Sequence, residues 1–354
     1  MVATYAQRLS RRGHEVIVAG GPEPLPSWKR RARVWIESLI EGTPPPHFQA
    51  YPPSPFDELQ GVRVIRVPHP GPFEDRDLPD ADVVIATWWE TAEWVARLAP
   101  SKGAKVYFIQ GKESTIDGMP SERVEATLRL PLFPITVSEF LLEHLKRTHG
   151  RSEAVLVPNP VDLIRFNAPP RGKARRPTLS CVYTRGARIK GFDIAIAAIF
   201  ELRRALSDLQ VLCFGFDPPP RGQLPSFFEF FCNPPIQHIV GIYASSDLHL
   251  HTSRVEGFGL PILEAMACGT PVVATPAGAA PELLRSGGGI LARSFSPFDV
   301  AQAAYQVLTL PEGEWRELSR LAWKRARRHS IEDATSSFEE ALLQALSWSR
   351  SAGV

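Results

Sequence analysis

The chain lacks the features that mark several classes of protein. Its four cysteines contain no C-x-x-C pair, so we expect buried thiols in a reducing cytoplasm rather than disulfides or a cysteine metal site. No apolar run approaches the length of a membrane span. The net charge of +2 is too small for a nucleic-acid footprint, so no nucleic-acid partner is expected. No G-x-G-x-x-G motif follows a predicted strand, which disfavours a nicotinamide-dependent oxidoreductase.

Proline, in contrast, is abundant. The 34 prolines cluster in the segments GGPEPLP, GTPPPHFQAYPPSP, FDPPPRGQLP and CNPP, which indicates long irregular connections between regular elements. A length of 354 residues with 44% hydrophobic and 22% charged residues is typical of a globular protein with about two domains.

Short apolar strands alternate with amphipathic helices along the chain, which predicts an α/β fold with parallel sheets. The first half predicts a helix over 2–13, strands at 14–20, 62–67, 82–87, 105–109 and 135–137, and a helix over 139–149 capped by Ser138. The second half predicts strands at 178–184, 209–215, 248–253 and 271–275, helices at 192–206, 237–246, 261–269 and 297–309, and two final helices within 314–349.

The most informative stretch is 254–275, RVEGFGLPILEAMACGTPVVAT, where a strand runs through a glycine turn into a helix. Free N–H groups and the helix dipole make such a helix N-terminus a site for an anion, typically a phosphate. Glu256 lies in the turn and Glu264 about one helical turn into the helix. Because carboxylates accept hydrogen bonds from vicinal hydroxyls, the stretch predicts a sugar-nucleotide site. The alternative is two solvated charges on an ordinary connection.

This stretch resembles the E-x7-E signature of retaining glycosyltransferases of family 4, which have two Rossmann-like domains, the GT-B fold. Further segments resemble the family in the same order, namely 8–21, 135–145, 157–166, 184–193 and 242–253. The resemblance implies an α/β fold of two doubly wound domains, with a C-terminal helix that crosses back to the N-terminal domain. The expected ranges are an N-terminal acceptor-side domain at 1–167, a linker at 168–177, a C-terminal nucleotide-sugar-binding domain at 178–330, and the final helix at 331–354.

The resemblance also implies roles for individual residues. Glu256 would contact hydroxyls of the transferred sugar, and Glu264 would hold the nucleotide ribose. Arg185 and Lys190 would stabilise the charge that develops on the leaving diphosphate, so Glu256, Arg185 and Lys190 form the expected catalytic set. The other expected donor-binding residues are Gly257, Phe258, Gly259 and Leu260.

The acceptor side is predicted from fewer signals. Gln110 stands where many members of the family have a histidine, and its amide cannot shuttle a proton. Trp88 and Trp89 follow the strand at 82–87, and their rings suit stacking on a sugar, although packing in the core is an equal alternative.

We expect no cofactor and no catalytic metal. The Asp-x-Asp pairs that begin at Asp75 and Asp80 resemble a metal motif of another glycosyltransferase fold, but neither follows a strand as a ligand should. Both pairs are interpreted as structural.

The N-terminal end departs from the pattern. A doubly wound domain ordinarily opens with a strand, whereas this chain opens with a helix, so the family's first strand and glycine-rich turn are expected before residue 1. A start codon placed too late, a truncated chain and a diverged domain are the three alternatives.

Together these features predict a cytoplasmic glycosyltransferase that moves a sugar from a nucleotide-sugar donor to a saccharide or lipid-linked acceptor, as in cell-surface polysaccharide synthesis. The basic, tryptophan-containing segment 26–40 has two interpretations, a helix in contact with the inner face of a membrane or a helix docked on the sheet. Two other functions stay open, a non-catalytic or degenerate nucleotide-sugar-binding protein and a nucleotide-sugar epimerase.

Overall fold

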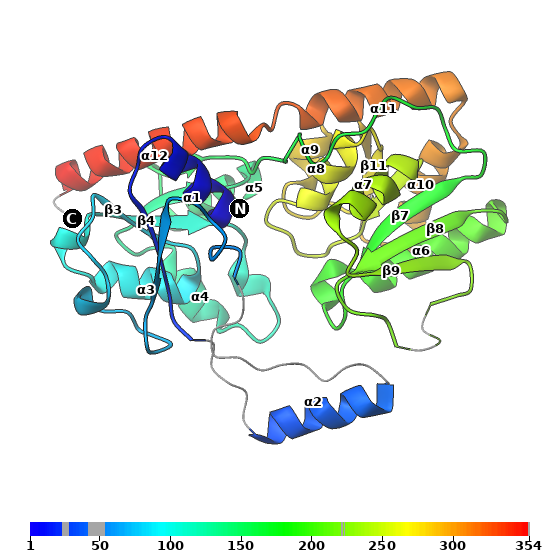
Figure 1. Cartoon of the computed structure of the whole chain (residues 1–354). Coiled ribbons are helices and arrows are strands. Elements are labelled where there is room, and N and C mark those ends of the chain that lie inside the picture. The colour runs from blue at the N-terminus through cyan, green and yellow to red at the C-terminus, as the bar shows by residue number, and fades with distance from the viewer. Residues whose placement is uncertain (23–27, 42–53, 221, 223, 353–354) are drawn as a thin grey trace. The chain divides into compact units, whose positions relative to one another are not determined.

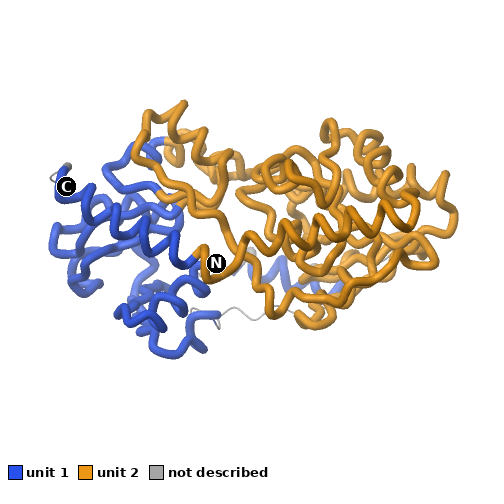
Figure 2. Tube along the Cα trace, turned by 90° about the horizontal axis from the view of Figure 1, so that it is seen from above, with its two compact units in different colours: residues 1–108, 126–134, 335–354 blue, residues 109–125, 135–334 orange. Residues whose placement is uncertain are grey.

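The computed structural model describes residues 1–22, 28–41, 54–220, 222 and 224–352 (Figure 1). They divide into two compact units (Figure 2): unit 1 comprises 1–108, 126–134 and 335–354, and unit 2 comprises 109–125 and 135–334. Each unit is a set of residues in mutual contact and is not a test of the predicted domain ranges. Those ranges stay a prediction. Among the described residues, no helix has both the length and the apolarity that crossing a membrane requires.

Unit 2 contains a six-stranded parallel sheet with the order β12-β11-β10-β7-β8-β9. Its strands are β7 (Thr178–Tyr183), β8 (Gln210–Gly215), β9 (Phe228–Cys232), β10 (Leu248–His251), β11 (Val272–Ala274) and β12 (Gly289–Leu291). The connecting helices are α6 (Phe192–Ala205), α7 (Ile236–Ser245), α8 (Leu260–Ala267), α9 (Ala280–Leu284), α10 (Pro297–Thr309) and α11 (Glu312–Ala326). From β7 the chain adds β8 and then β9 on one side of β7. It then adds β10, β11 and β12 on the other side, which is the doubly wound arrangement.

The core of this sheet follows from helical periodicity. Ala195, Ala198, Ile199 and Leu202 lie on one face of α6, and all four are buried against the sheet and α10. Cys181 and Cys213 are buried at facing positions of β7 and β8, as predicted. The prediction of four buried cysteines is wrong for Cys232, which ends the edge strand β9 and is exposed.

Unit 1 begins with α1 (Val2–Arg11) and contains β1 (Val16–Gly20) and β2 (Val62–Arg66), which pair in parallel. The first and last helices meet within this unit, because Tyr5 of α1 stacks on Phe338 of α12 (Ile331–Ala352) at a ring-centroid distance of 4.4 Å. Arg12 adds an ion pair to Glu339 at 2.6 Å. The predicted return of the C-terminal helix to the N-terminal part of the chain is confirmed.

The remaining strands, β3 (Val83–Ala86), β4 (Ala104–Ile109), β5 (Phe133–Thr136) and β6 (Val155–Leu156), form a sheet in that order. The remaining α-helices are α2 (Trp28–Glu41), α3 (Trp89–Arg97), α4 (Ser121–Thr127) and α5 (Glu139–His149). α5 has the predicted bounds, since the Ser138 hydroxyl accepts from the Leu141 N–H at its start and Gly150 adopts the left-handed conformation at its end. Short 3-10 turns occur at Asp75–Asp77, Pro100–Lys102, Glu113–Thr115 and Arg188–Lys190.

Candidate functional site

The predicted donor residues lie where the strand order of the six-stranded sheet reverses. β7 and β10 are adjacent and parallel, so the loop after each strand leaves from the same edge of the sheet. The first loop is 184–191, and the second is 252–259. Ligands of open α/β sheets bind at the carboxyl ends of strands at such a reversal, so the topology alone marks this edge as the candidate site.

The two loops are bonded to each other. The Arg254 N–H donates to the Ile189 carbonyl at 2.7 Å, and the Thr252 hydroxyl donates to the Gly191 carbonyl at 2.9 Å. The Arg254 guanidinium also makes a bidentate contact with the Asp193 carboxylate, at 2.6 Å for each nitrogen. Hydrogen bonds therefore join residues that are more than sixty positions apart in the sequence.

Glu256 and Lys190 meet within this surface. Lys190 Nζ donates to Glu256 Oε2 at 2.8 Å, and the Ser253 hydroxyl donates to the same oxygen at 3.0 Å. Burial alone would raise the pKa of Glu256, but interactions with His251, Lys190 and Ser253 outweigh burial and hold that pKa below its ordinary value. The site thus presents an ionised carboxylate next to an ammonium group.

His251, at the end of β10, is a site residue that the sequence analysis did not identify. Its Nε2 lies 3.7 Å from Glu256 Oε2 and, among the described residues, is buried without a hydrogen-bond partner. Burial is the main cause that lowers the pKa of His251; Glu256 opposes this shift and Lys190 adds to it. A neutral imidazole can donate or accept a hydrogen bond from a sugar or phosphate group. The sequence could have indicated His251 through its position at the carboxyl end of the strand LHLH, where ligands of a parallel sheet bind.

Glu264 lies in α8 with a different environment. The Tyr243 hydroxyl donates to Glu264 Oε2 at 3.2 Å. Burial raises the pKa of Glu264 from its ordinary 4.5 to about 7, and the bond from Tyr243 only partly opposes this shift. Without a ligand this carboxyl is therefore poised between its neutral and charged forms at neutral pH. A ribose that donated hydroxyl hydrogen bonds would favour the charged form.

The glycines of the turn are required by close approaches and backbone conformation. A Cβ atom on Gly257 would lie 1.8 Å from the Gln110 carbonyl oxygen, so only glycine fits next to this backbone. Gly259 caps α8 with a φ of 93°, a conformation that side chains disfavour. Phe258 between them is buried, and Leu260 begins the helix. The structure thus brings Gln110 to the turn through its backbone.

The other predicted site residues occupy separate places. Arg185 is exposed in the loop after β7, the same loop that carries Lys190. Trp88 caps α3 and is half-buried, while Trp89 is 5% exposed, which fits the packing alternative better than sugar stacking. Their acceptor role stays a prediction.

The two Asp-x-Asp pairs have local partners. Asp75 accepts from the Ala99 N–H at 2.8 Å, and Asp77 accepts from the Glu74 N–H at 2.8 Å. Asp80 accepts from the Lys102 ammonium at 2.9 Å. These contacts are consistent with the structural interpretation for Asp75, Asp77 and Asp80.

Comparison with known proteins gives a match to one family model. Residues 176–310 match the model described as glycosyl transferases group 1, so this range carries a domain similar to that family. O-antigen chain mannosyltransferase B of Escherichia coli is 32% identical over 118 residues, which is 33% of this chain and 30% of that protein. D-inositol 3-phosphate glycosyltransferase of Corynebacterium jeikeium is 33% identical over 132 residues, 33% of this chain and 32% of that protein. The chain thus spans about a third of the length of these curated relatives.

Solved structures establish the fold over more of the chain. HepE of Anabaena, solved in complex with UDP and glucose, matches with a TM-score of 0.66 and 16% identity, covering 93% of this chain and 99% of HepE. Sucrose-phosphate synthase of Thermosynechococcus elongatus matches with a TM-score of 0.63 and 18% identity, covering 75% and 74% of the two chains. The predicted fold class, α/β with two Rossmann-like domains of the GT-B type, is confirmed.

Proposed function

We propose that this protein is a retaining glycosyltransferase of family 4 that transfers a sugar from a nucleotide-sugar donor to a saccharide or lipid-linked acceptor, in the synthesis of cell-surface polysaccharide. The observation that carries the proposal is the Lys190–Glu256 pair, which lies in the loops that follow β7 and β10. The strand order of the sheet reverses there, and doubly wound sheets bind nucleotides at such a reversal. The relatives support sugar transfer, and the UDP-bound HepE structure supports a nucleotide-sugar donor.

The pair fits the charges of the reaction. The bond between the sugar's anomeric carbon and the diphosphate oxygen breaks, and a bond to the acceptor oxygen forms on the same face of the sugar. The acceptor's proton passes to the leaving phosphate, which needs no protein base. Negative charge grows on the diphosphate as its bond breaks, so a fixed ammonium group such as Lys190 stabilises the transition state more than the ground state.

Glu256 has two tasks in this account. Before the donor binds, it holds Lys190 in position and keeps the cation partly neutralised. When the donor is bound, its carboxylate accepts hydrogen bonds from the sugar hydroxyls, while Lys190 turns to the diphosphate. Glu264, poised near neutrality, accepts the ribose hydroxyls.

The phosphate contacts are proposed to come from the chain itself rather than from a divalent ion. Pro261 has no N–H, and the Ile262 N–H donates to the Gly259 carbonyl at 2.9 Å. The helix start of α8 therefore offers the Leu260 N–H rather than a full set of donors. Lys190 and Arg185 supply the positive charge.

Contact with a membrane surface is proposed for α2, in a protein that otherwise resides in the cytoplasm. Four large apolar side chains of α2, at positions 35, 36, 39 and 40, follow helical spacing and are 50–80% exposed: Trp35, Ile36, Leu39 and Ile40. Pro26 and Ser27 of the predicted segment lie outside the described residues. A lipid-linked acceptor would be reached from such a surface.

A second candidate, a non-catalytic nucleotide-sugar-binding protein, is favoured by one observation. The backbone of Gln110 lies next to the signature turn, at the position where the resemblance to family 4 implies a histidine, so one contact expected of an active member is missing.

The test is a screen of the full chain against a panel of nucleoside diphosphate sugars, with saccharide and lipid-linked acceptors. Acceptor-dependent release of nucleoside diphosphate, unchanged by a metal chelator, is the expected result. Vesicles of anionic lipid should retain the protein and increase transfer to a lipid-linked acceptor. Binding of a nucleoside diphosphate without any turnover would favour the second candidate. Turnover that is lost with chelator and returns with Mg²⁺ would refute the metal-free mechanism.

A further inference from the structure

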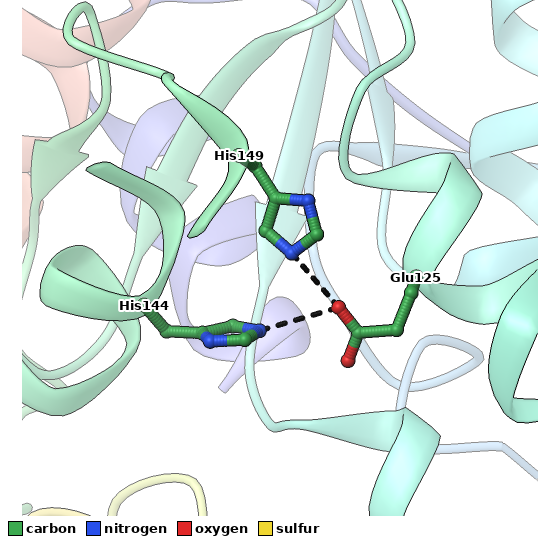
Figure 3. Close-up of side chains that lie close together, drawn as sticks. All are labelled: Glu125, His144 and His149. Carbon is green, nitrogen blue, oxygen red and sulfur yellow. Dashed lines mark hydrogen bonds and ion pairs between the residues drawn. The ribbon is translucent and has the colours of Figure 1, made fainter. Parts of the chain in front are cut away.

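Three side chains outside the donor site converge on one point (Figure 3). Glu125 lies in α4, and His144 and His149 lie in α5. His149 Nε2 is 2.8 Å from Glu125 Oε2, and His144 Nε2 is 3.3 Å from the same oxygen. The three candidate ligand atoms all lie within 4.8 Å of one another. None of these residues belongs to the loops that carry Lys190 or Glu256.

Glu125 and His144 each contact a further hydroxyl group. The Ser114 hydroxyl donates to Glu125 Oε1, the oxygen that does not face the histidines. Thr148 Oγ1 lies 3.3 Å from His144 Nδ1, so the second nitrogen of that ring is also engaged. Hydroxyl or carbonyl groups that hold the far side of a ligand are the usual second layer of a metal site.

The cluster is partly shielded from water. The exposed fraction of the side chain is 1% for His149, 14% for His144 and 25% for Glu125. Glu125 is the most exposed of the three side chains, so the cluster opens to solvent on its side.

We propose that Glu125, His144 and His149 bind a divalent transition-metal ion, with Zn²⁺ as the preferred ion. Two imidazole nitrogens and one carboxylate oxygen are a donor set typical of zinc, and water from the open side completes the tetrahedron. Zinc bonds of about 2.0–2.2 Å put neighbouring ligands of a tetrahedron about 3.3–3.6 Å apart. The separation of His144 Nε2 from Glu125 Oε2 is 3.3 Å, within that range, and that of His149 Nε2 is 2.8 Å, which would lengthen when the ion binds.

The ion would link α4 to α5 rather than act on the sugar. Glu125 precedes the histidines by 19 and 24 residues, so the ion would join two segments that are separate along the chain. Metal that binds only the folded state stabilises that state by mass action, so the melting temperature should rise with Zn²⁺ concentration. This proposal does not depend on the proposed transferase activity.

The test uses the full chain, stripped with chelator and desalted, then dialysed against Zn²⁺ or Co²⁺. The wild-type protein is expected to retain one equivalent of Zn²⁺, to melt at a higher temperature with Zn²⁺, and to give with Co²⁺ the visible absorption of a tetrahedral site. His144→Gln and His149→Gln should each weaken binding by more than the roughly 10–100-fold that loss of an outer partner costs, and Ser114→Ala should fall within that range.

His238→Gln is the matched control, since His238 is an exposed histidine elsewhere in unit 2 and should leave binding unchanged. Circular dichroism of each metal-free variant shows whether it is folded. A wild-type protein that retains no more Zn²⁺ than the His144→Gln/His149→Gln double variant, or that gives no tetrahedral Co²⁺ spectrum, would overturn the proposal, and the second result does not depend on any variant being folded.

Discussion

Replacing Glu256 with glutamine is expected to lower kcat by about 10²–10³-fold, the effect typical of losing one group that stabilises a transition state. The side chain keeps its size but loses the charge that accepts hydroxyl hydrogen bonds and holds Lys190 at 2.8 Å. Affinity for the free nucleoside diphosphate should be retained or should rise, because Lys190 no longer has a competing carboxylate.

The measurement is a comparison of kcat with the dissociation constant for nucleoside diphosphate, from steady-state kinetics and calorimetry. Glu229→Gln serves as a control, since Glu229 is exposed on the edge strand β9. If Glu256→Gln lost nucleoside diphosphate affinity as strongly as it lost turnover, Glu256 would be a nucleotide ligand and its assigned role would be wrong.

Glu264→Gln is expected to stabilise the unliganded protein at pH 8 by up to about 3 kcal/mol, the value of a pKa shift from 4.5 to about 7. Between pH 4.5 and about pH 7 the folded protein binds more protons at the Glu264 carboxyl than the unfolded protein does. The free energy of unfolding of the wild type therefore falls as pH rises through that window. Glutamine keeps the acceptor for the Tyr243 hydroxyl but removes the cost of burying a charge.

Urea unfolding at pH 5 and pH 8 measures this difference. Glu282 also has a pKa raised to about 7, mainly by burial, so part of the pH dependence should persist in the variant. Glu256→Gln should instead lower the free energy of unfolding at pH 8. The pKa of Glu256 is lowered in the folded protein, so its charge stabilises the folded state above pH 4.5. A Glu264→Gln protein no more stable than the wild type at pH 8 would contradict the assigned pKa.

Local chemistry made parts of the structure predictable from the sequence. Ser138 and Gly150 mark both ends of α5, because a helix cap needs only neighbouring residues. The turn before α8 was also predicted from local residues, because Gly259 and Pro261 are residue types that favour the start of a helix. The helix α6 was likewise predicted to within one residue, and Ser296, Pro297 and Asp299 correctly marked the start of α10.

Features that depend on distant contacts were not predictable in this way. The contact between Lys190 and Glu256 exists because β7 and β10 are neighbours in the sheet, and no local pattern specifies that neighbour. β9 was missed, because it lies between two proline-rich segments and is too short to show a clear period. The Glu125, His144 and His149 cluster has no metal-motif spacing, so only the fold reveals it.

The proposed function requires that the Lys190 ammonium, at the edge of the sheet where β7 and β10 end, holds the donor diphosphate. Calorimetric titration of the full chain with the nucleoside diphosphate of its preferred donor tests this claim directly, with Lys190→Ala compared to the wild type and to Lys324→Ala, an exposed lysine of α11. Lys190→Ala is expected to weaken binding by about 10–100-fold, the loss of a hydrogen bond to a charged group, while Lys324→Ala should bind as the wild type does. Equal affinities for all three proteins would contradict it.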